Sequence, residues 1–131
     1  MKKSFLIMAT LAMALVSCSE PAQPLAIDNA LTEAEIAAAR LTPEVMWKMR
    51  RIGSAEVSDD GKVVLYTVTD YSMAENRGVT RIYTLNLNSG ETTELTDTSS
   101  NNTAARWGGD GYIWFLSNRS GAMQVWKMAA D

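Results

Sequence analysis

Histidine is absent from the 131-residue sequence, and cysteine occurs once, as Cys18. Hydroxyl nucleophiles of hydrolases usually need histidine as the base, and the sequence also lacks a Gly-x-Ser-x-Gly turn. We therefore predict no catalytic residue within this chain, and no cofactor site. Basic residues are fewer than acidic ones, 12 against 15, and the net charge of −3 argues against binding to nucleic acid.

The spacing of a calcium-binding loop is also missing. Asp59, Asp60 and Asp97 do not form the alternating D-x-D-x-D-G pattern of an EF-hand. Aspartate commonly stabilises tight turns next to glycine and serine, and these residues lie in such stretches. We therefore predict turns at these positions and no metal site.

No apolar run is long enough for a membrane-spanning helix. The apolar stretch covers only residues 5–16, whereas a span needs about 20 residues. It follows Lys2-Lys3 and ends in Leu15-Val16-Ser17-Cys18, which resembles a bacterial lipobox. We predict a lipoprotein signal peptide over residues 1–18 with Cys18 as the lipid-attachment residue. The expected location is the outer membrane, on its periplasmic side or at the cell surface; the alternative is an ordinary cleavage site with an incidental cysteine.

Residues 19–41 are interpreted as a tether with a short helix, and a second helix follows. Thr32-x-x-Glu35 is a capping box in front of an alanine-rich run, and Thr42-Pro43 is another helix start. Gly53 is the predicted end of the second helix. Its large apolar side chains are expected to pack against the following strands, and its basic end to be solvated. The apolar side chains are Met46, Trp47 and Met49. The basic residues are Lys48, Arg50 and Arg51.

The rest of the chain contains a repeat. Placing Asp60-Gly61 on Asp110-Gly111, an offset of 50 (110 − 60), sets Val63 on Ile113 and Leu65 on Phe115. Further on, residues 81–83 match residues 124–126 at an offset of 43 (124 − 81). A period of about 50 residues built from short strands is typical of a β-propeller. The predicted fold class is therefore all-β, with propeller blades preceded by short helices.

Strands are predicted at residues 55–58, 62–69, 80–88 and 91–95. Blade 1 would cover about residues 55–95, and an incomplete blade 2 about residues 104–131. The connection over residues 70–79 is longer than a hairpin needs and is either a functional loop or a solvated excursion. Because four blades need about 200 residues, we expect residues 42–131 to begin an N-terminal propeller of a longer protein. The chain would then be a truncated fragment with about one and three-quarter four-stranded antiparallel blades.

Residues 41–128 contain segments typical of one family. These are Thr42-Pro43-Glu44 with Trp47, then Ile52-Gly53-Ser54 leading into VSDDGKVVLYTVTDY, and then ENRGVTRIYTLNLNSGE. They resemble the start of the propeller in bacterial members of the prolyl oligopeptidase family, in its dipeptidyl-peptidase and acylaminoacyl-peptidase branch. The segment ARWGGDGYIWFLSNRSGAMQVWKM resembles a repeat that this branch shares with TolB-like periplasmic proteins. Both repeats keep only the Asp-Gly of the family's usual Ser-Pro-Asp-Gly turn.

The resemblance implies an exported serine peptidase in which a propeller covers an α/β-hydrolase domain and screens peptides by size. The catalytic serine, aspartate and histidine would belong to that later domain, so no catalytic position is assigned here. The implied partners are a peptide substrate and, through Cys18, the membrane; the oligomeric state is left open. The alternative is a TolB-like periplasmic propeller that serves as a binding or scaffold lipoprotein without enzymatic activity.

Overall fold

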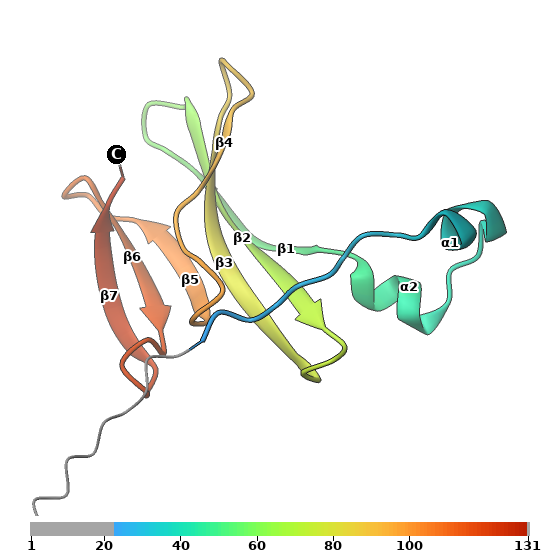
Figure 1. Ribbon diagram of the computed structural model, residues 1–131. Helices are drawn as coiled ribbons and strands as arrows, with labels where there is room; N and C mark the ends of the chain where they lie inside the picture. Colours follow the sequence, from blue (N-terminus) through green and yellow to red (C-terminus); the bar gives the residue numbers. More distant parts are fainter. Residues whose placement is uncertain (1–22, 131) are drawn as a thin grey trace, which may run out of the picture.

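The computed structural model describes residues 23–130 (Figure 1). Two short helices, α1 (Glu33–Ala38) and α2 (Pro43–Lys48), precede seven strands. The strands are β1 (Arg51–Val57), β2 (Val63–Ser72), β3 (Arg77–Asn86), β4 (Thr92–Glu94), β5 (Asn102–Trp107), β6 (Tyr112–Ser117) and β7 (Gln124–Ala129). They form two antiparallel sheets, in the orders β1-β2-β3-β4 and β5-β6-β7. The predicted all-β fold of blade-like sheets preceded by short helices is confirmed.

Both predicted helix starts are confirmed. In α1, the hydroxyl oxygen of Thr32 accepts from the backbone N–H of Glu35 at 3.2 Å, and the Glu35 carboxylate accepts from the backbone N–H of Thr32 at 2.7 Å. In α2, the Thr42 hydroxyl accepts from the backbone N–H of Val45 at 3.3 Å. These bonds satisfy N–H groups that have no partner inside the helix.

The predicted end of α2 is wrong, and its predicted packing is confirmed only for Trp47, whose ring meets that of Tyr71 in β2. The helix ends at Lys48, because Met49 already has extended backbone angles, and Gly53 lies within β1. Of the helix's residues only Val45 is buried, while Met46 is 46% exposed and Met49 is 52% exposed. A helix of six residues presents too short a stripe to bury side chains on several sides.

The connection between β2 and β3 is a tight turn rather than a ten-residue loop. The ladder continues to the pair Ser72 and Arg77, so only residues 73–76 lie outside it. The Ser72 hydroxyl accepts from the backbone N–H of Glu75 at 3.3 Å, and Asn76 has a positive φ of 47°. Asparagine tolerates this conformation better than most residues. The chain can therefore reverse within four residues, and the two strands pair beyond their apolar stretches.

The two sheets repeat one hairpin, with a one-residue difference in its turn. Val57 pairs with Val64 in the first sheet, and Trp107 pairs with Ile113 in the second. The offset between the sheets is therefore 50 before the turn (107 − 57) and 49 after it (113 − 64). The sequence-based alignment uses 50 throughout, so its match of Val63 with Ile113 is wrong by one residue. Such a slip assigns every side chain of the strand to the opposite face.

The second predicted offset is confirmed by the pairing. Tyr66 of β2 pairs with Tyr83 of β3, and Phe115 of β6 pairs with Trp126 of β7. Since Tyr66 corresponds to Phe115 at the offset of 49, Tyr83 corresponds to Trp126 at the offset of 43 (126 − 83). The repeat is thus real in three strands of each sheet.

The sheets lie side by side, and one face of the first packs against one face of the second (Figure 1). Their shared core consists of Leu65, Ile82, Ala105, Ile113 and Phe115. Hydrogen bonds add to this contact at both ends. The indole N–H of Trp107 donates to the carbonyl of Glu56 at 3.2 Å, and the side-chain oxygen of Asn101 accepts from the backbone N–H of Thr80 at 2.9 Å.

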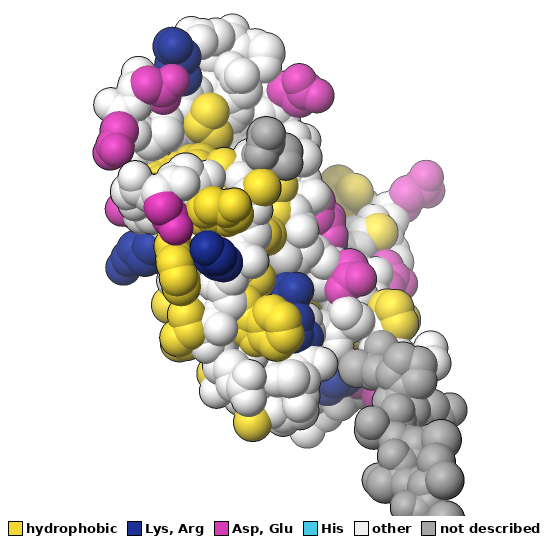
Figure 2. Space-filling view, turned by 90° about the vertical axis from the view of Figure 1, so that its left-hand side faces the viewer, with side chains coloured by type: hydrophobic (Ala, Val, Ile, Leu, Met, Phe, Trp, Pro, Cys, Tyr) yellow, Lys and Arg dark blue, Asp and Glu magenta, His cyan; other side chains and the backbone are white. Residues whose placement is uncertain are grey.

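The outer face of the second sheet has no comparable cover within residues 23–130. Figure 2 shows hydrophobic side chains gathered there. Trp114 is 39% exposed and Val125 is 64% exposed, whereas the corresponding Leu65 and Ile82 are 1% and 0% exposed. Equivalent positions are therefore buried in one sheet and open in the other.

Candidate functional site

The predicted lipid-attachment residue, Cys18, lies outside the described residues. Among residues 23–130, none of the helices is both long and apolar enough to span a bilayer. The same range contains no group of three His, Cys, Asp or Glu side chains that could hold a metal ion. The remaining candidates are surface pockets and buried polar clusters.

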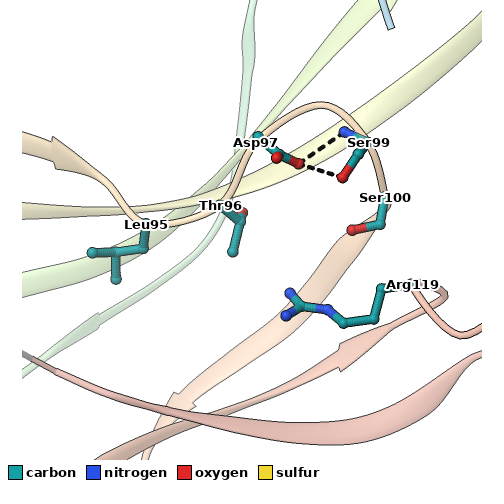
Figure 3. Close-up of a pocket in the computed structure, with 6 residues that line it drawn as sticks. All are labelled: Leu95, Thr96, Asp97, Ser99, Ser100 and Arg119. Atoms are coloured by element: carbon teal, nitrogen blue, oxygen red, sulfur yellow. Dashed lines mark hydrogen bonds between the residues drawn. The ribbon is translucent and has the colours of Figure 1, made fainter. Parts of the chain in front are cut away.

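One pocket lies where the chain crosses from the first sheet to the second (Figure 3). Its volume is about 260 Å³. This crossing pocket is lined by Leu95, Thr96, Asp97, Ser99, Ser100 and Arg119. The first five residues follow β4, whereas Arg119 belongs to the turn between β6 and β7. The pocket is therefore small, mostly polar, and built from both sheets.

Arg119 is held by the second sheet. Its Nε donates to Ser117 Oγ at 3.1 Å and its Nη2 to Asn102 Oδ1 at 3.0 Å. Its guanidinium carbon lies 5.0 Å from the ring centre of Phe115 and 5.1 Å from that of Trp126. Because Ser117 and Asn102 are fully buried, their oxygens fix the guanidinium group firmly. Nη1 has no hydrogen-bond partner within the described range and stays available.

Asp97 supplies the opposite charge in the crossing pocket. One of its carboxylate oxygens accepts from the backbone N–H of Ser99 at 2.9 Å and from the hydroxyl of Ser99 at 2.5 Å. These bonds to Ser99, together with the positive charge of Arg119, lower the pKa of Asp97. The carboxylate is therefore ionised at neutral pH. The predicted turn role of Asp97 is confirmed, as is that of Asp60, which accepts from the backbone N–H of Lys62 at 3.1 Å.

The two charges of the crossing pocket do not form an ion pair with each other. Of the ion pairs between described residues, none joins Asp97 to Arg119. Figure 3 shows Asp97 on the loop after β4 and Arg119 on the separate turn beneath it. The arrangement can bind a small polar ligand. Hydrolysis would also need a nucleophile with an adjacent base, and the residues that line the pocket do not supply that pair.

A second hollow lies beside α2 and the β2–β3 turn. It has two parts of about 400 and 280 Å³, and Trp47, Tyr71 and Met73 line both. The rings of Trp47 and Tyr71 meet edge to face with their centres 4.9 Å apart. The guanidinium carbon of Arg51 lies 4.9 Å and 4.6 Å from these ring centres. Arg51 is exposed, as expected, and two aromatic faces also attract its cation.

A buried carboxylate ties the N-terminal segment to the first sheet. Asp70 is fully buried, and it accepts from Asn29 Nδ2 at 2.7 Å and from Arg50 Nε at 2.9 Å. Arg81 also pairs with Asp70 and forms two bonds of 2.9 and 2.8 Å to Glu94. Two arginines and two carboxylates thus balance in charge where residues 23–50 meet the sheet. The Arg50 side chain is 50% exposed, as expected of a solvated residue, and it also pairs with the buried Asp70.

The sequence-based interpretation does not identify Arg119, Asp70 or Arg81 as site residues. Asp97 and Arg119 lie 22 positions apart (119 − 97) and belong to different sheets, so no local pattern joins them. A signal for Asp70 does exist. It is an acidic residue that continues an apolar strand, and such a residue is rarely buried without a cationic partner.

Two curated proteins are similar to this chain. The protein named dipeptidyl-peptidase 5 from Porphyromonas gingivalis is 38% identical over 86 residues, which are 65% of this chain and 13% of that protein. Dipeptidyl-peptidase 5 from Porphyromonas endodontalis is 33% identical over 92 residues, which are 70% of this chain and 13% of that protein. No family model matches the sequence. The similarity supports a relationship to dipeptidyl-peptidases, although the chain spans only a small part of their length.

Proposed function

We propose that the chain is the N-terminal part of an exported, lipid-anchored serine exopeptidase or oligopeptidase. Its two sheets would be the first blades of a propeller that gates or positions peptides for an α/β-hydrolase domain elsewhere in the protein. The observation that carries the proposal is the 38% identity to a dipeptidyl-peptidase over 86 residues. The matched length is 65% of this chain.

The uncovered outer face of the second sheet supports further blades. Leu65 and Ile82 are buried because another sheet packs on them, and Trp114 and Val125 occupy the same positions one sheet later. Repeat proteins bury such faces by stacking the next unit. A third sheet on this face would continue the same packing toward a closed propeller.

In this proposal the described residues contribute shape and binding, and the chemical step belongs to other residues. A propeller rim restricts access by size, which excludes folded proteins and admits short peptides. The polar crossing pocket and the aromatic hollow lie at the same end of the first sheet, where β2 ends and β4 leads into the crossing. A peptide that passes this end would meet hydrogen-bonding groups and aromatic rings.

The peptidase proposal is tested with the full-length protein. Dipeptidyl and acyl-aminoacyl chromogenic substrates are assayed with and without a serine-directed phosphonate. Turnover by the full-length protein that the phosphonate abolishes, with none by residues 19–131 alone, is the expected result. A well-folded full-length protein without turnover would contradict it and favour the TolB-like binding lipoprotein.

Lipid anchoring through Cys18 is tested separately. The Cys18→Ala variant should lose metabolic labelling with palmitate and move to the soluble exported fraction, while a Ser19→Ala variant keeps its label. One acyl chain gives only marginal membrane binding, whereas two or more make it stable. Unchanged labelling of Cys18→Ala would rule out this anchor without touching the peptidase proposal.

A further inference from the structure

The crossing pocket holds two opposite charges that are fixed separately. Arg119 is fixed by buried oxygens and two aromatic rings of the second sheet, and Asp97 is fixed by its turn with Ser99. Each still has capacity for one more partner. The second carboxylate oxygen of Asp97 and the Nη1 of Arg119 have no hydrogen-bond partner among residues 23–130.

Of the hydroxyl groups that line the pocket, that of Thr96 can donate a hydrogen bond to a ligand, whereas that of Ser100 is turned away. Thr96 Oγ1 accepts from the backbone N–H of Ile82 at 2.9 Å, which leaves its own hydroxyl proton free to donate. Ser100 is buried and turned to Asn102, with 2.9 Å between Asn102 Nδ2 and the Ser100 carbonyl. The donors therefore lie around Arg119 and Thr96, and the strong acceptor is Asp97.

We propose that the crossing pocket binds a small zwitterion, either a free amino acid or a dipeptide. Its ammonium group donates to the Asp97 carboxylate, and its carboxylate accepts from the Arg119 guanidinium. Both contacts are charge-assisted hydrogen bonds, and the planar guanidinium suits a carboxylate. The pocket of about 260 Å³ lies just below the range of about 300–1,000 Å³ for drug-sized ligands, which fits one or two residues.

A zwitterion fits this pocket better than a single ion. An anion alone would be attracted by Arg119 but repelled by Asp97. A cation alone would be attracted by Asp97 but repelled by Arg119. The two charges lie on separate segments, and no ion pair among the described residues joins them. A ligand that carries both charges satisfies both walls. The inference stands on the pocket itself and does not depend on the peptidase proposal.

The test compares three forms of one dipeptide by calorimetry on the full-length protein. These are alanyl-leucine, its N-acetylated form and its C-terminal amide. The zwitterion should bind, and each blocked form should bind about tenfold or more weakly, since each loses a hydrogen bond between charged groups. Equal binding of all three forms, or no binding of the zwitterion at about 10 mM, would overturn the proposal.

Two variants assign the contacts. Asp97→Asn keeps the shape of the turn and should remove the penalty for N-acetylation only, whereas Arg119→Gln should remove the penalty for amidation only. This crossed pattern cannot arise from general unfolding, which would weaken all forms alike. Asp60→Asn is the matched control, because Asp60 forms the same kind of turn at the opposite end of the first sheet and should leave all three affinities unchanged.

The remaining outcomes are equally decisive. If the N-acetylated form binds as well as the zwitterion and Arg119→Gln abolishes both, the pocket is a simple anion site and the proposal is wrong. If the zwitterion binds but neither variant changes the selectivity, the ligand occupies another part of the protein and the proposal is also wrong. Loss of the zwitterion's preference in the crossed pattern supports it whether or not the full-length protein hydrolyses peptides.

Discussion

The two sheets share one strand pattern but differ in what covers them. Leu65 and Ile82 of the first sheet are buried by the second sheet, whereas their counterparts Trp114 and Val125 face outward. The difference therefore comes from the neighbour and not from the strand. In a repeat protein, the burial of a residue depends on the adjacent unit as well as on its own sequence.

The sheets also differ in the polar groups at the end where β2 and β6 finish. The first sheet buries the Asp70 carboxylate between Arg50 and Arg81. The second buries only uncharged oxygens, those of Asn102 and Ser117, and keeps Arg119 exposed. Charge is thus internal in one sheet and faces a pocket in the other.

The largest expected effect breaks this second contrast. Asp70→Ala should destabilise the protein by about 3–5 kcal/mol, because it leaves the largely buried Arg81 without its main counter-charge. Asp60→Ala, which removes an exposed carboxylate, should destabilise the protein far less. Urea unfolding of both variants in the full-length protein measures the difference. Equal losses would show that burial of Asp70 has no special energetic role.

The next prediction separates the two apolar faces. Leu65→Ala should cost about 2–5 kcal/mol wherever both sheets are present, because it leaves a cavity in their core. Trp114→Ala should cost much less in residues 19–131 alone than in the full-length protein, where a further sheet would bury it. If Trp114→Ala lowers the free energy of unfolding equally in residues 19–131 and in the full-length protein, that further sheet does not cover Trp114.

The smallest expected effect concerns the contact between the sheets. Trp107→Phe removes the indole N–H that bonds the carbonyl of Glu56 and leaves most of the apolar contact. The expected loss is about 0.5–1.5 kcal/mol. The control is Trp114→Phe, also in residues 19–131, which removes only an exposed indole bond of 3.3 Å to Asp110 and should cost less. Urea unfolding of the two variants measures this difference in the free energy of unfolding, provided that the dependence of that free energy on urea concentration is the same for both. A larger loss of stability for Trp114→Phe than for Trp107→Phe would contradict the assignment of Trp107 to the contact between the sheets and of Trp114 to the open outer face.

Much of the fold could be predicted from the sequence, because its signals are local. The capping box at Thr32 and the Asp-Gly turns depend on neighbouring residues, and both are present in the structure. The strand register after the turn between β1 and β2 could not be predicted from local sequence. The two turns differ by one residue in length, and only the pairing of Val64 and Ile113 with their partners reveals it.

The candidate site could not be predicted in the same way. The crossing pocket depends on how the β6–β7 turn approaches the segment after β4, and this approach is set by the packing of the two sheets. Charged residues near turns are common on protein surfaces, so Asp97 and Arg119 carry no distinctive local signal. Burial of Asp70 likewise depends on three segments that meet only in the folded chain.

The order of the strands has a consequence for how the protein folds. Every strand pairs with its immediate neighbour in sequence, and the two sheets follow one another along the chain. Such short loop closures favour rapid pairing, so the first sheet can form while later residues are still being synthesised. Until β5 arrives, however, the face of Leu65 and Ile82 is open to other chains. Folding of each sheet therefore creates a brief aggregation risk that only the next sheet ends.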